Sequence, residues 1–347
     1  MYRFLLILIA FVTGANSALH ELLVGTFSTK FIYTVEFDDE ASTLRLVGNQ
    51  SVPYAANWLA FSHNKANLYT TAYGQSNEAQ NPMFLSYSIA NATSIEHQAT
   101  LDAGGGCSAT SIFISGTLES VVQNYTYFPN VSGVHGAVLS PDSRFLYSAD
   151  DSGNTLWTHS VDRRTGEVTY MANLTGPSAG SDPRHVTIYP NGRYLYVILE
   201  GTSQLAQYTV DAHGIPHFDT AYPLLLTALS PAAYWADEVA LSASKKYLWA
   251  TNRARAANST GFVSVFSLSD EGAIVKQNFL IPSSSSGGIS NILTPNPSID
   301  RWAALTSNST GFLEIWELKE DGTSASVAAH LDINDGGGCC SNALWYS

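Results

Sequence analysis

Four ionisable residues stand at the ends of apolar, strand-like segments and could together carry out acid–base chemistry on an anion. His135 and Arg184 open the segments HGAVLS and RHVTIY, whereas Glu200 and Arg253 close the segments YLYVILE and YLWATNR. A guanidinium group binds a carboxylate through two hydrogen bonds and stays charged, and a histidine or a glutamate can transfer a proton. A single charged residue at a strand end is usually only solvated surface, so this interpretation depends on a fold that gathers all four.

The segments that carry these residues belong to a repeat, which predicts the fold. Copies begin at Asn57 (NWLAFSHNKANLYTTAYG), His135 (HGAVLSPDSRFLYSAD), Arg184 (RHVTIYPNGRYLYVILE), Asp237 (DEVALSASKKYLWATNR) and Ser290 (SNILTPNPSIDRWAALTSN). Each copy is an alternating apolar strand, a turn rich in Pro, Asn, Asp, Gly or Ser, and a second apolar strand, which is the pattern of a β-hairpin. A third strand and a more polar fourth strand follow, and four antiparallel strands per repeat indicate a propeller blade.

The spacing of the copies predicts an all-β fold, a seven-bladed β-propeller with four-stranded antiparallel blades. From His135 the copies recur after 49, 53, 53 and 51 residues, and the last, at Ser341, has a single strand. We expect this C-terminal strand to join the N-terminal blade and close the ring, which leaves no exposed edge. Only 78 residues separate Asn57 from His135, so the third blade, beginning near Cys107, is expected to be shortened, unless residues are missing from the sequence there.

This architecture predicts that the four ionisable residues converge. In an antiparallel blade the first strand begins and the second strand ends on the same face, near the central channel. His135, Arg184, Glu200 and Arg253 come from three consecutive blades and should therefore surround one mouth of the channel. His185 follows Arg184 directly, and the two-residue alternation of a strand predicts that it points to the opposite face and packs there.

Six more histidines and one possible ion site carry weaker signals. Six other histidines show no mutual spacing and are expected to lie on the surface or to pack within blades: His63, His97, His159, His213, His217 and His330. Glu200, Asp150 and Asp237 could in principle gather a calcium ion. The chemistry described above requires no metal, and we predict neither a metal site nor a cofactor.

Six segments are shared with a known family. They are VGTF, GVHGAVLSPDSRFLYSADDSGNTLWTH, DPRHVTIYPNGRYLYVILE, YLWATNRA, GGISN and NALWY, and they span most of the chain outside the third blade. Through them the chain resembles the fungal 3-carboxy-cis,cis-muconate lactonising enzymes, seven-bladed propellers of the broad lactonase group. The resemblance implies that the catalytic histidine, two arginines and glutamate proposed for that family correspond to His135, Arg184, Arg253 and Glu200.

The resemblance also implies a reaction, carboxymuconate cyclase activity without a metal. One carboxylate of the muconate adds across a carbon–carbon double bond, a lactone closes, and a proton is delivered to the neighbouring carbon. Either His135 or Glu200 could handle this proton. The chain departs from the family pattern at Ile289, where the family has histidine, and in its shortened third blade.

Two alternative functions stay open, because the muconate is an intracellular metabolite whereas this chain begins with an export signal. One is a secreted lactone hydrolase that uses the same residues to stabilise an oxyanion. The other is a non-catalytic secreted or cell-wall glycoprotein that binds a partner through the faces of the propeller.

The N-terminus has the pattern of a secretory signal peptide. Arg3 precedes an apolar run at 4–12 and the small residues Ala15, Asn16 and Ser17, so we predict a signal at 1–17 and a single propeller domain at 18–347. No later segment is apolar for long enough to span a membrane as a helix. We therefore predict a secreted protein, located outside the cell or in the cell wall.

Charge limits the partners of this chain. The formal net charge is −13, which argues against nucleic-acid binding, since that depends on Lys and Arg neutralising phosphates. An anionic substrate, a tricarboxylate or a lactone acid, would need a local cluster of cations.

Sequons and cysteines give two further predictions. N-glycans are expected at seven N-x-[ST] sequons: Asn49, Asn91, Asn124, Asn130, Asn173, Asn258 and Asn308. An oxidising compartment permits Cys107 to form a disulfide with Cys339 or Cys340, and the alternative is three buried thiols.

Overall fold

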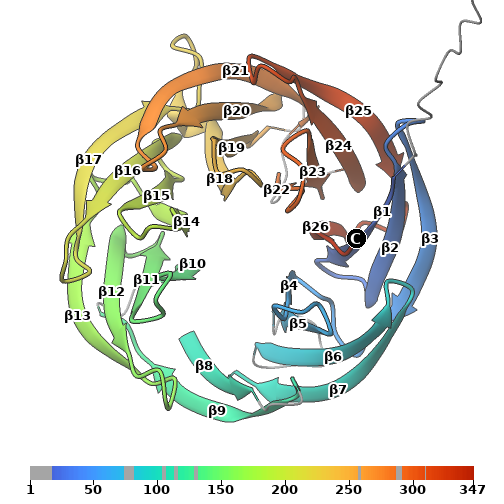
Figure 1. Cartoon of the computed structure of the whole chain (residues 1–347), viewed down its shortest axis with the longest axis horizontal. Helices are drawn as coiled ribbons and strands as arrows, with labels where there is room; N and C mark the ends of the chain where they lie inside the picture. Colours follow the sequence, from blue (N-terminus) through green and yellow to red (C-terminus); the bar gives the residue numbers. More distant parts are fainter. Residues whose placement is uncertain are drawn as a thin grey trace, which may run out of the picture.

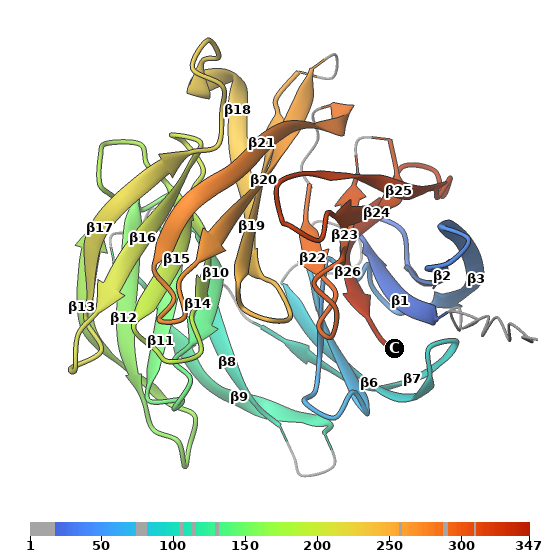
Figure 2. The ribbon, with the colours of Figure 1, turned by 45° about the horizontal axis from the view of Figure 1, so that its top comes forward.

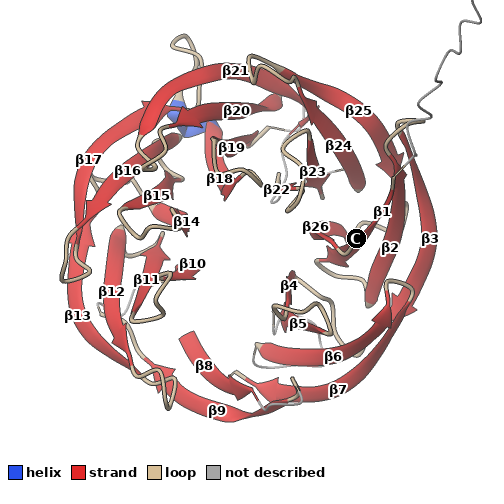
Figure 3. Cartoon of the chain, viewed as in Figure 1, coloured by secondary structure: helices blue, strands red, loops and turns tan. Residues whose placement is uncertain are grey.

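A computed structural model describes residues 18–73, 82–103, 107–112, 116–128, 132–256, 259–286, 291–308 and 310–347. The predicted signal peptide, the sequons at Asn130 and Asn258, and Ile289 lie outside the described residues. Figure 1 shows the described strands arranged in a ring around a central axis, and Figure 3 shows that nearly all regular structure is strand. The exception among the described residues is the short 3-10 helix η1 (Pro231–Ala233), and no described helix could cross a membrane.

Six sheets of four strands make up most of the ring. The first holds β26 (Cys339–Trp345), β1 (Leu19–Thr26), β2 (Phe31–Asp38) and β3 (Thr43–Ser51), and the second β4 (Trp58–Phe61), β5 (Asn67–Ala72), β6 (Met83–Asn91) and β7 (Ser94–Asp102). Then come β10 (Val134–Leu139), β11 (Phe145–Asp150), β12 (Thr155–Val161) and β13 (Val168–Thr175), followed by β14 (Pro183–Ile188), β15 (Tyr194–Leu199), β16 (Gln204–Val210) and β17 (Pro216–Pro223). The last two hold β18 (Tyr234–Leu241), β19 (Tyr247–Ala254), β20 (Thr260–Leu268) and β21 (Ile274–Ser286), and β22 (Leu293–Pro295), β23 (Trp302–Ser307), β24 (Phe312–Leu318) and β25 (Ala325–Asp332).

The predicted all-β propeller is confirmed. Among the described residues six blades have four strands, while β8 (Cys107–Ile112) and β9 (Leu118–Tyr125) form a sheet of two. This pair lies between the β4–β7 and β10–β13 sheets (Figure 1). The chain between β7 and β10 is too short to supply four strands.

The hairpins of four blades share one turn geometry. Lys65, Ser143, Gly192 and Lys245 end the turn sequences SHNK, SPDS, YPNG and SASK, and all four have positive φ, from 55° to 77°. The N–H of each donates to the carbonyl oxygen three residues earlier. A tight turn followed by a left-handed residue is a common hairpin connection, so the repeat in the sequence is a repeat of turn chemistry as well as of apolar strands.

The hydrophobic core lies between neighbouring sheets. One buried cluster joins Leu22 and Phe37 of the first sheet to Trp302 and Leu313 of the last, and the rings of Phe37 and Trp302 are 5.0 Å apart. Burying each such side chain contributes about 1.5–3 kcal/mol. Figure 2 shows the β10–β13, β14–β17 and β18–β21 sheets side by side. These three sheets carry the candidate site.

The two ends of the chain meet in one sheet. Strand β26 pairs antiparallel with β1, with Leu344 opposite Leu23. Next to it, the side chain of Asn342 accepts a hydrogen bond from the N–H of Leu59 at 2.8 Å and donates to the Leu59 carbonyl at 3.0 Å. The C-terminal strand therefore bonds to the N-terminal strand on one side and contacts the following blade on the other.

The predicted disulfide from Cys107 is wrong. Cys339 and Cys340 are bonded to each other within β26. Each of these two sulfurs already has its partner, so neither is available to Cys107, whose backbone lies in β8.

Candidate functional site

A β-bulge occurs at the start of the inner strand of each of three consecutive blades, and two of the four candidate residues, His135 and Arg184, lie on these bulges. In β10, Val134 and Gly136 pair with Asp150 and Ala149, so that His135 between them has no residue opposite. A bulge inserts one extra residue into a strand and redirects its side chains, and bulges are common next to active sites.

The other two bulges have the same form. In β14 Arg184 and His185 together oppose one residue of β15, and in β18 Asp237 and Glu238 together oppose one residue of β19. These bulges place two consecutive polar side chains near the axis in each blade, where a regular strand would place one.

The structure brings together three of the four predicted residues and adds Asp237. Arg184 Nε lies 2.8 Å from Glu200 Oε2, and Arg184 Nη1 contacts Asp237 Oδ1 and donates to the Asp237 carbonyl at 2.8 Å. Arg253 lies 3.6 Å from the same two carboxylates, through Nη2 to Glu200 and Nη1 to Asp237. Glu200 follows β15 directly and Arg253 lies in β19, so the cluster joins two blades.

This cluster of two arginines and two carboxylates is almost completely buried. Arg184 is 4% exposed, Arg253 6% and Asp237 0%. Burial opposes the ionisation of Asp237, but the guanidinium groups of Arg184 and Arg253 outweigh it and lower the pKa of this carboxyl to about 2. The two positive and two negative groups balance, which is what allows four charges to be buried together.

For Glu200, burial has a larger effect on the pKa than the two arginines have. Burial raises the pKa of its carboxyl, and the opposing effect of Arg184 and Arg253 is not sufficient to cancel that rise. A carboxyl with a raised pKa at the wall of a pocket is a candidate for proton transfer.

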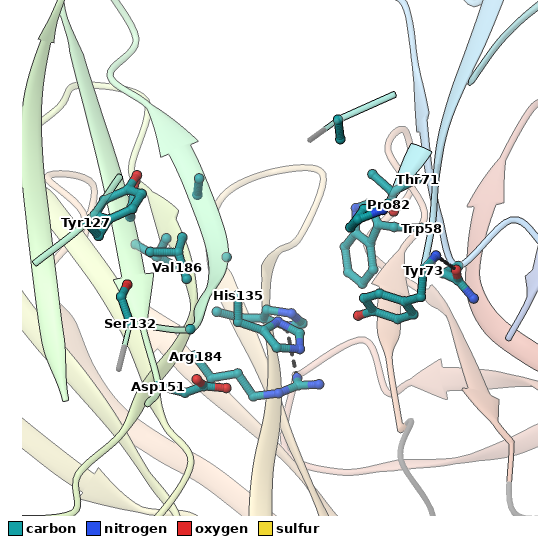
Figure 4. Close-up of a pocket in the computed structure, with 18 of the residues that line it drawn as sticks. Trp58, Thr71, Tyr73, Pro82, Tyr127, Ser132, His135, Asp151, Arg184 and Val186 are labelled. Carbon is teal, nitrogen blue, oxygen red and sulfur yellow. Dashed lines mark hydrogen bonds between the residues drawn. The ribbon is translucent and has the colours of Figure 1, made fainter. Parts of the chain in front are cut away.

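His135 faces the pocket beside this cluster. Figure 4 shows its ring next to Arg184, with Asp151 and Ser132 nearby. Burial lowers the pKa of His135, and the charge of Arg184 acts in the same direction, although the residue is exposed to the pocket. A neutral imidazole at this position can accept or donate a hydrogen bond.

The prediction that His185 packs on the opposite face is wrong. Its ring lies 4.8 Å from that of His135 and 5.3 Å from that of Trp58, and it lines the same pocket. Its Nδ1 is 2.8 Å from Glu238 Oε2. The bulge at Arg184 and His185 is the physical reason, because it breaks the alternation on which the prediction depended.

The opposite wall of the pocket is largely aromatic and apolar. The cavity has a volume of about 1140 Å³ and extends from His135 and Arg184 to Trp58, Tyr73 and Met83. Figure 4 shows Trp58 and Tyr73 across the pocket from His135 and Arg184. A molecule in this pocket would contact polar groups on one side and ring faces on the other.

The described residues do not bring the proposed calcium ligands together. Asp150 accepts hydrogen bonds from Ser132, the N–H groups of Gly133 and Gly153, and the indole N–H of Trp157. Its carboxylate supports the loop around Ser132, and no group of three or more possible metal ligands occurs among the described residues.

Comparison with known proteins decides the family. Residues 127–286 match the family model described as lactonase, 7-bladed beta-propeller. The chain is 32% identical to a carboxy-cis,cis-muconate cyclase of Neurospora crassa, over 83% of this chain and 89% of that protein. The chain belongs to the seven-bladed β-propeller lactonase family. Within that family it is similar to a carboxymuconate cyclase.

Two more distant proteins are also similar to this lactonase-family chain, one in sequence and one in fold. It is 26% identical to muconate cycloisomerase 1 of Cutaneotrichosporon cutaneum, over 81% of this chain and 84% of that protein. Among solved structures, the periplasmic gluconolactonase PpgL of Pseudomonas aeruginosa superposes with a TM-score of 0.80 at 17% identity, covering 95% of this chain and 99% of that one.

Sequence reasoning missed three residues of this lactonase-family site. The sequence pattern suggests only a calcium ligand at Asp237, predicts packing for His185, and gives no role to Glu238. A signal for them was present, because HGAVLSP, RHVTIYP and DEVALSA align as copies of one repeat. The pairs Arg184–His185 and Asp237–Glu238 occupy equivalent positions in that alignment.

Proposed function

We propose that this protein is a carboxymuconate cyclase-like enzyme that closes a lactone on an unsaturated polycarboxylate without a metal. The observation that carries the proposal is the buried cluster of Arg184, Arg253, Glu200 and Asp237 at the wall of a pocket. The 32% identity to a carboxy-cis,cis-muconate cyclase of Neurospora crassa supports the same chemistry.

Arg253 is the residue that we assign to the substrate carboxylate. Its contacts to Glu200 and Asp237 are 3.6 Å long, whereas the same two carboxylates hold Arg184 more closely. A substrate carboxylate can replace Glu200 in front of Arg253 with little rearrangement. Arg184 then acts as a positioning residue, because it fixes Glu200 and Asp237.

The reaction needs charge stabilisation and one proton. A carboxylate oxygen of the substrate forms a bond to one alkene carbon, and the electron pair of the double bond moves to the neighbouring carbon. The resulting enediolate-like charge is stabilised by a guanidinium group, a kind of donor typically worth about 3 kcal/mol. Protonation of that carbon completes the lactone, and Glu200 and His135 are the candidates that the sequence offers as its source.

Lactone hydrolysis is the second candidate, and the charge of the cluster favours it. The two guanidinium groups are matched by two carboxylates, so the site is not strongly cationic and would accept a less charged lactone. Water would then attack the ester carbon, with Arg253 stabilising the oxyanion.

The ultraviolet absorbance of 3-carboxy-cis,cis-muconate mixed with the purified protein tests the proposal. We expect the diene absorbance to fall with the wild type and with Arg255→Gln, and to fall roughly 10²–10³-fold more slowly with Arg253→Gln. The control is matched, because Arg255 and Arg253 lie over the same ring, Trp235, and Arg255 is exposed. If the wild type leaves the diene intact, cycloisomerisation is excluded, and release of acid from added lactones then tests hydrolysis.

We further infer that residues 1–17 direct secretion and that residues 18–347 form one seven-bladed domain, with β8 and β9 as its reduced third blade. The family description supports seven blades, and the position of β8 and β9 between two complete blades supports the assignment. The exposed side chains of Asn49, Asn91, Asn124 and Asn173 are consistent with glycosylation in that pathway.

A further inference from the structure

A buried carboxyl group and a buried imidazole meet at the pocket wall, outside the arginine cluster. Glu238 Oε2 lies 2.8 Å from His185 Nδ1, and the two side chains are 12% and 7% exposed. They sit on the bulges of β18 and β14, in adjacent blades. Both line the pocket, together with His135.

The hydrogen bonds around this contact place a proton on Glu238. Nη1 of Arg184 lies 3.4 Å from His185 Nδ1, and arginine can only donate, so Nδ1 is the unprotonated nitrogen of the ring. Glu238 Oε2 lies 2.8 Å from this nitrogen and has no hydrogen-bond donor among the described residues. A charged carboxylate oxygen would be unfavourable there, beside a lone pair and without a donor, so the carboxyl group holds its own proton.

The electrostatic surroundings agree with a neutral pair. Burial raises the pKa of Glu238 to about 8 and lowers that of His185 well below its usual range. The charged groups that act on the pair are Arg184 of β14, Asp237 of β18 and Arg253 of β19, and the neutral His135 of β10 faces it. Arg184 is already held by Asp237 and Glu200, so Glu238 has no cation of its own.

We propose that His185 and Glu238 form a proton-sharing pair that supplies the proton of the reaction to the substrate. This inference rests on the proposed function and adds to it a source for the proton. His185 gives a ring proton to the carbon that carries the developing negative charge, and Nδ1 takes the carboxyl proton of Glu238 as it does so. Glu238 is left as a carboxylate. After the product leaves, the ring nitrogen that gave up its proton regains one from water, and Nδ1 returns its proton to Glu238.

The pair is better suited to this step than a lone carboxyl group. Glu200 accepts from Arg184 at 2.8 Å and would lose that contact in part on protonation. Glu238, by contrast, keeps its hydrogen bond from the N–H of Val239 in either state, through Oε1 at 2.9 Å. Glu238 acts through His185, so it is a positioning and proton-storing residue.

Glu238→Gln is the informative variant, because glutamine keeps the shape and can still donate to His185 Nδ1 but cannot release a proton. Glu314→Gln is the matched control. Glu314 is also buried beside a histidine, with Oε1 2.9 Å from His330 Nδ1, and it lies in β24, away from the pocket. Melting temperatures of both variants show whether each is folded.

The first measurement needs no substrate. The infrared difference spectrum of wild type minus Glu238→Gln should contain the carbonyl band of a protonated carboxylic acid at neutral pH. That band should disappear as the pH rises through about 8 and should shift promptly in heavy water, because the proton exchanges with the pocket. The absence of the band at neutral pH would overturn the proposal.

The second measurement is kinetic and uses 3-carboxy-cis,cis-muconate. We expect Glu238→Gln to lower kcat by roughly 10²-fold, with KM little changed, and to remove the loss of activity above about pH 8 that the wild type should show. Glu314→Gln should keep the wild-type kcat and pH profile. Unchanged kcat and pH profile in folded Glu238→Gln would also overturn the proposal. If the wild type itself shows no turnover, the proposed function has failed, and the infrared result alone decides whether the pair holds a proton.

Discussion

Asp237 connects the charged residues of the site to one another. Its carboxylate contacts both Arg184 and Arg253, and Oδ2 accepts a hydrogen bond from the N–H of Asn291 at 2.5 Å. The bond to Asn291 ties the start of the next blade to the cluster. Asp237 therefore stabilises the fold as well as the pocket. We expect its replacement to lower the free energy of unfolding in addition to any effect on the reaction rate.

Asp237→Asn should lower the free energy of unfolding by about 3–5 kcal/mol, because it leaves a buried arginine pair with one carboxylate. The folded-state pKa of Asp237 is depressed to about 2 from 3.8, so its stabilisation is present above 3.8 and is lost as the pH falls through about 2. Denaturant unfolding of the variant should accordingly be less sensitive to acid over that range. The exposed carboxylate of Asp142, paired with Arg144, provides the control, and Asp142→Asn should leave stability nearly unchanged, because an exposed ion pair contributes little. Equal effects of the two substitutions would contradict this account.

His159 shows how a histidine can belong to the core. Its ring lies 4.6 Å from Tyr125 and 5.4 Å from Tyr127, and neither ring nitrogen has a hydrogen-bond partner among the described residues. Burial lowers its pKa from 6.5 to about 4, so protonation favours the unfolded chain.

Replacing this residue, His159→Phe, should therefore remove an acid sensitivity. The stabilising effect of neutral His159 is fully present above pH 6.5 and is lost as the pH falls toward about 4. The melting temperature of the wild type should fall more over that interval than that of the variant. Parallel melting curves for the two proteins would show that the ring is already solvated.

The bulges of β10, β14 and β18 are the elements that define the site. They bring the backbones of β10 and β14 so close that a side chain at Gly136 would meet β14. A Cβ there would lie 2.6 Å from the Arg184 carbonyl oxygen and 2.9 Å from the His185 Cα atom. Both contacts are with backbone, so β14 would have to move.

Gly136→Ala should cost about 1–3 kcal/mol of stability through overpacking, and more in catalysis. A displacement of about 1 Å at a reacting group can cost 10²-fold in rate, and Arg184 and His185 both move with β14. Gly48→Ala is the control, because its Cβ would meet only side-chain atoms of Thr93 and Thr34 at 3.5 and 3.6 Å. Muconate turnover and melting temperature, measured on both variants, separate the two effects; equal turnover would show that β14 adapts without moving the site.

At the scale of the whole molecule, the ring separates an inner face from an outer face. The inner strands carry the site, and the outer strands carry sequons. Asn49 lies in β3, Asn124 in β9 and Asn173 in β13, and Asn91 ends β6, all with exposed side chains. Glycans at these positions would surround the rim of the propeller and leave the pocket open.

The full-length chain, expressed in a eukaryotic secretory host, should therefore be recovered from the medium and should lose mass on treatment with an N-glycosidase. Asn49→Gln, Asn91→Gln, Asn124→Gln and Asn173→Gln should each remove one increment of that mass and leave activity unchanged, because no described sequon lines the pocket. Mass spectrometry of the intact protein counts the increments. Protein that stays inside the cell without glycans would contradict the proposed secretion.

Local sequence determined much of this protein. The alternating apolar strands and the turns SHNK, SPDS, YPNG and SASK predicted the hairpins and the propeller, since each depends on residues close together in the chain. The positions of His135, Arg184, Glu200 and Arg253 at strand ends predicted where they would meet.

Only the tertiary structure decided how these residues act. Arg184 and Arg253 are neutralised by Asp237 and Glu200, because the ring brings segments dozens of residues apart into contact. His185 reaches the pocket because bulges, which depend on strand pairing, interrupt the alternation of the sequence. In each case the deciding contact or register is set by the assembled blades, and no local pattern of residues records it.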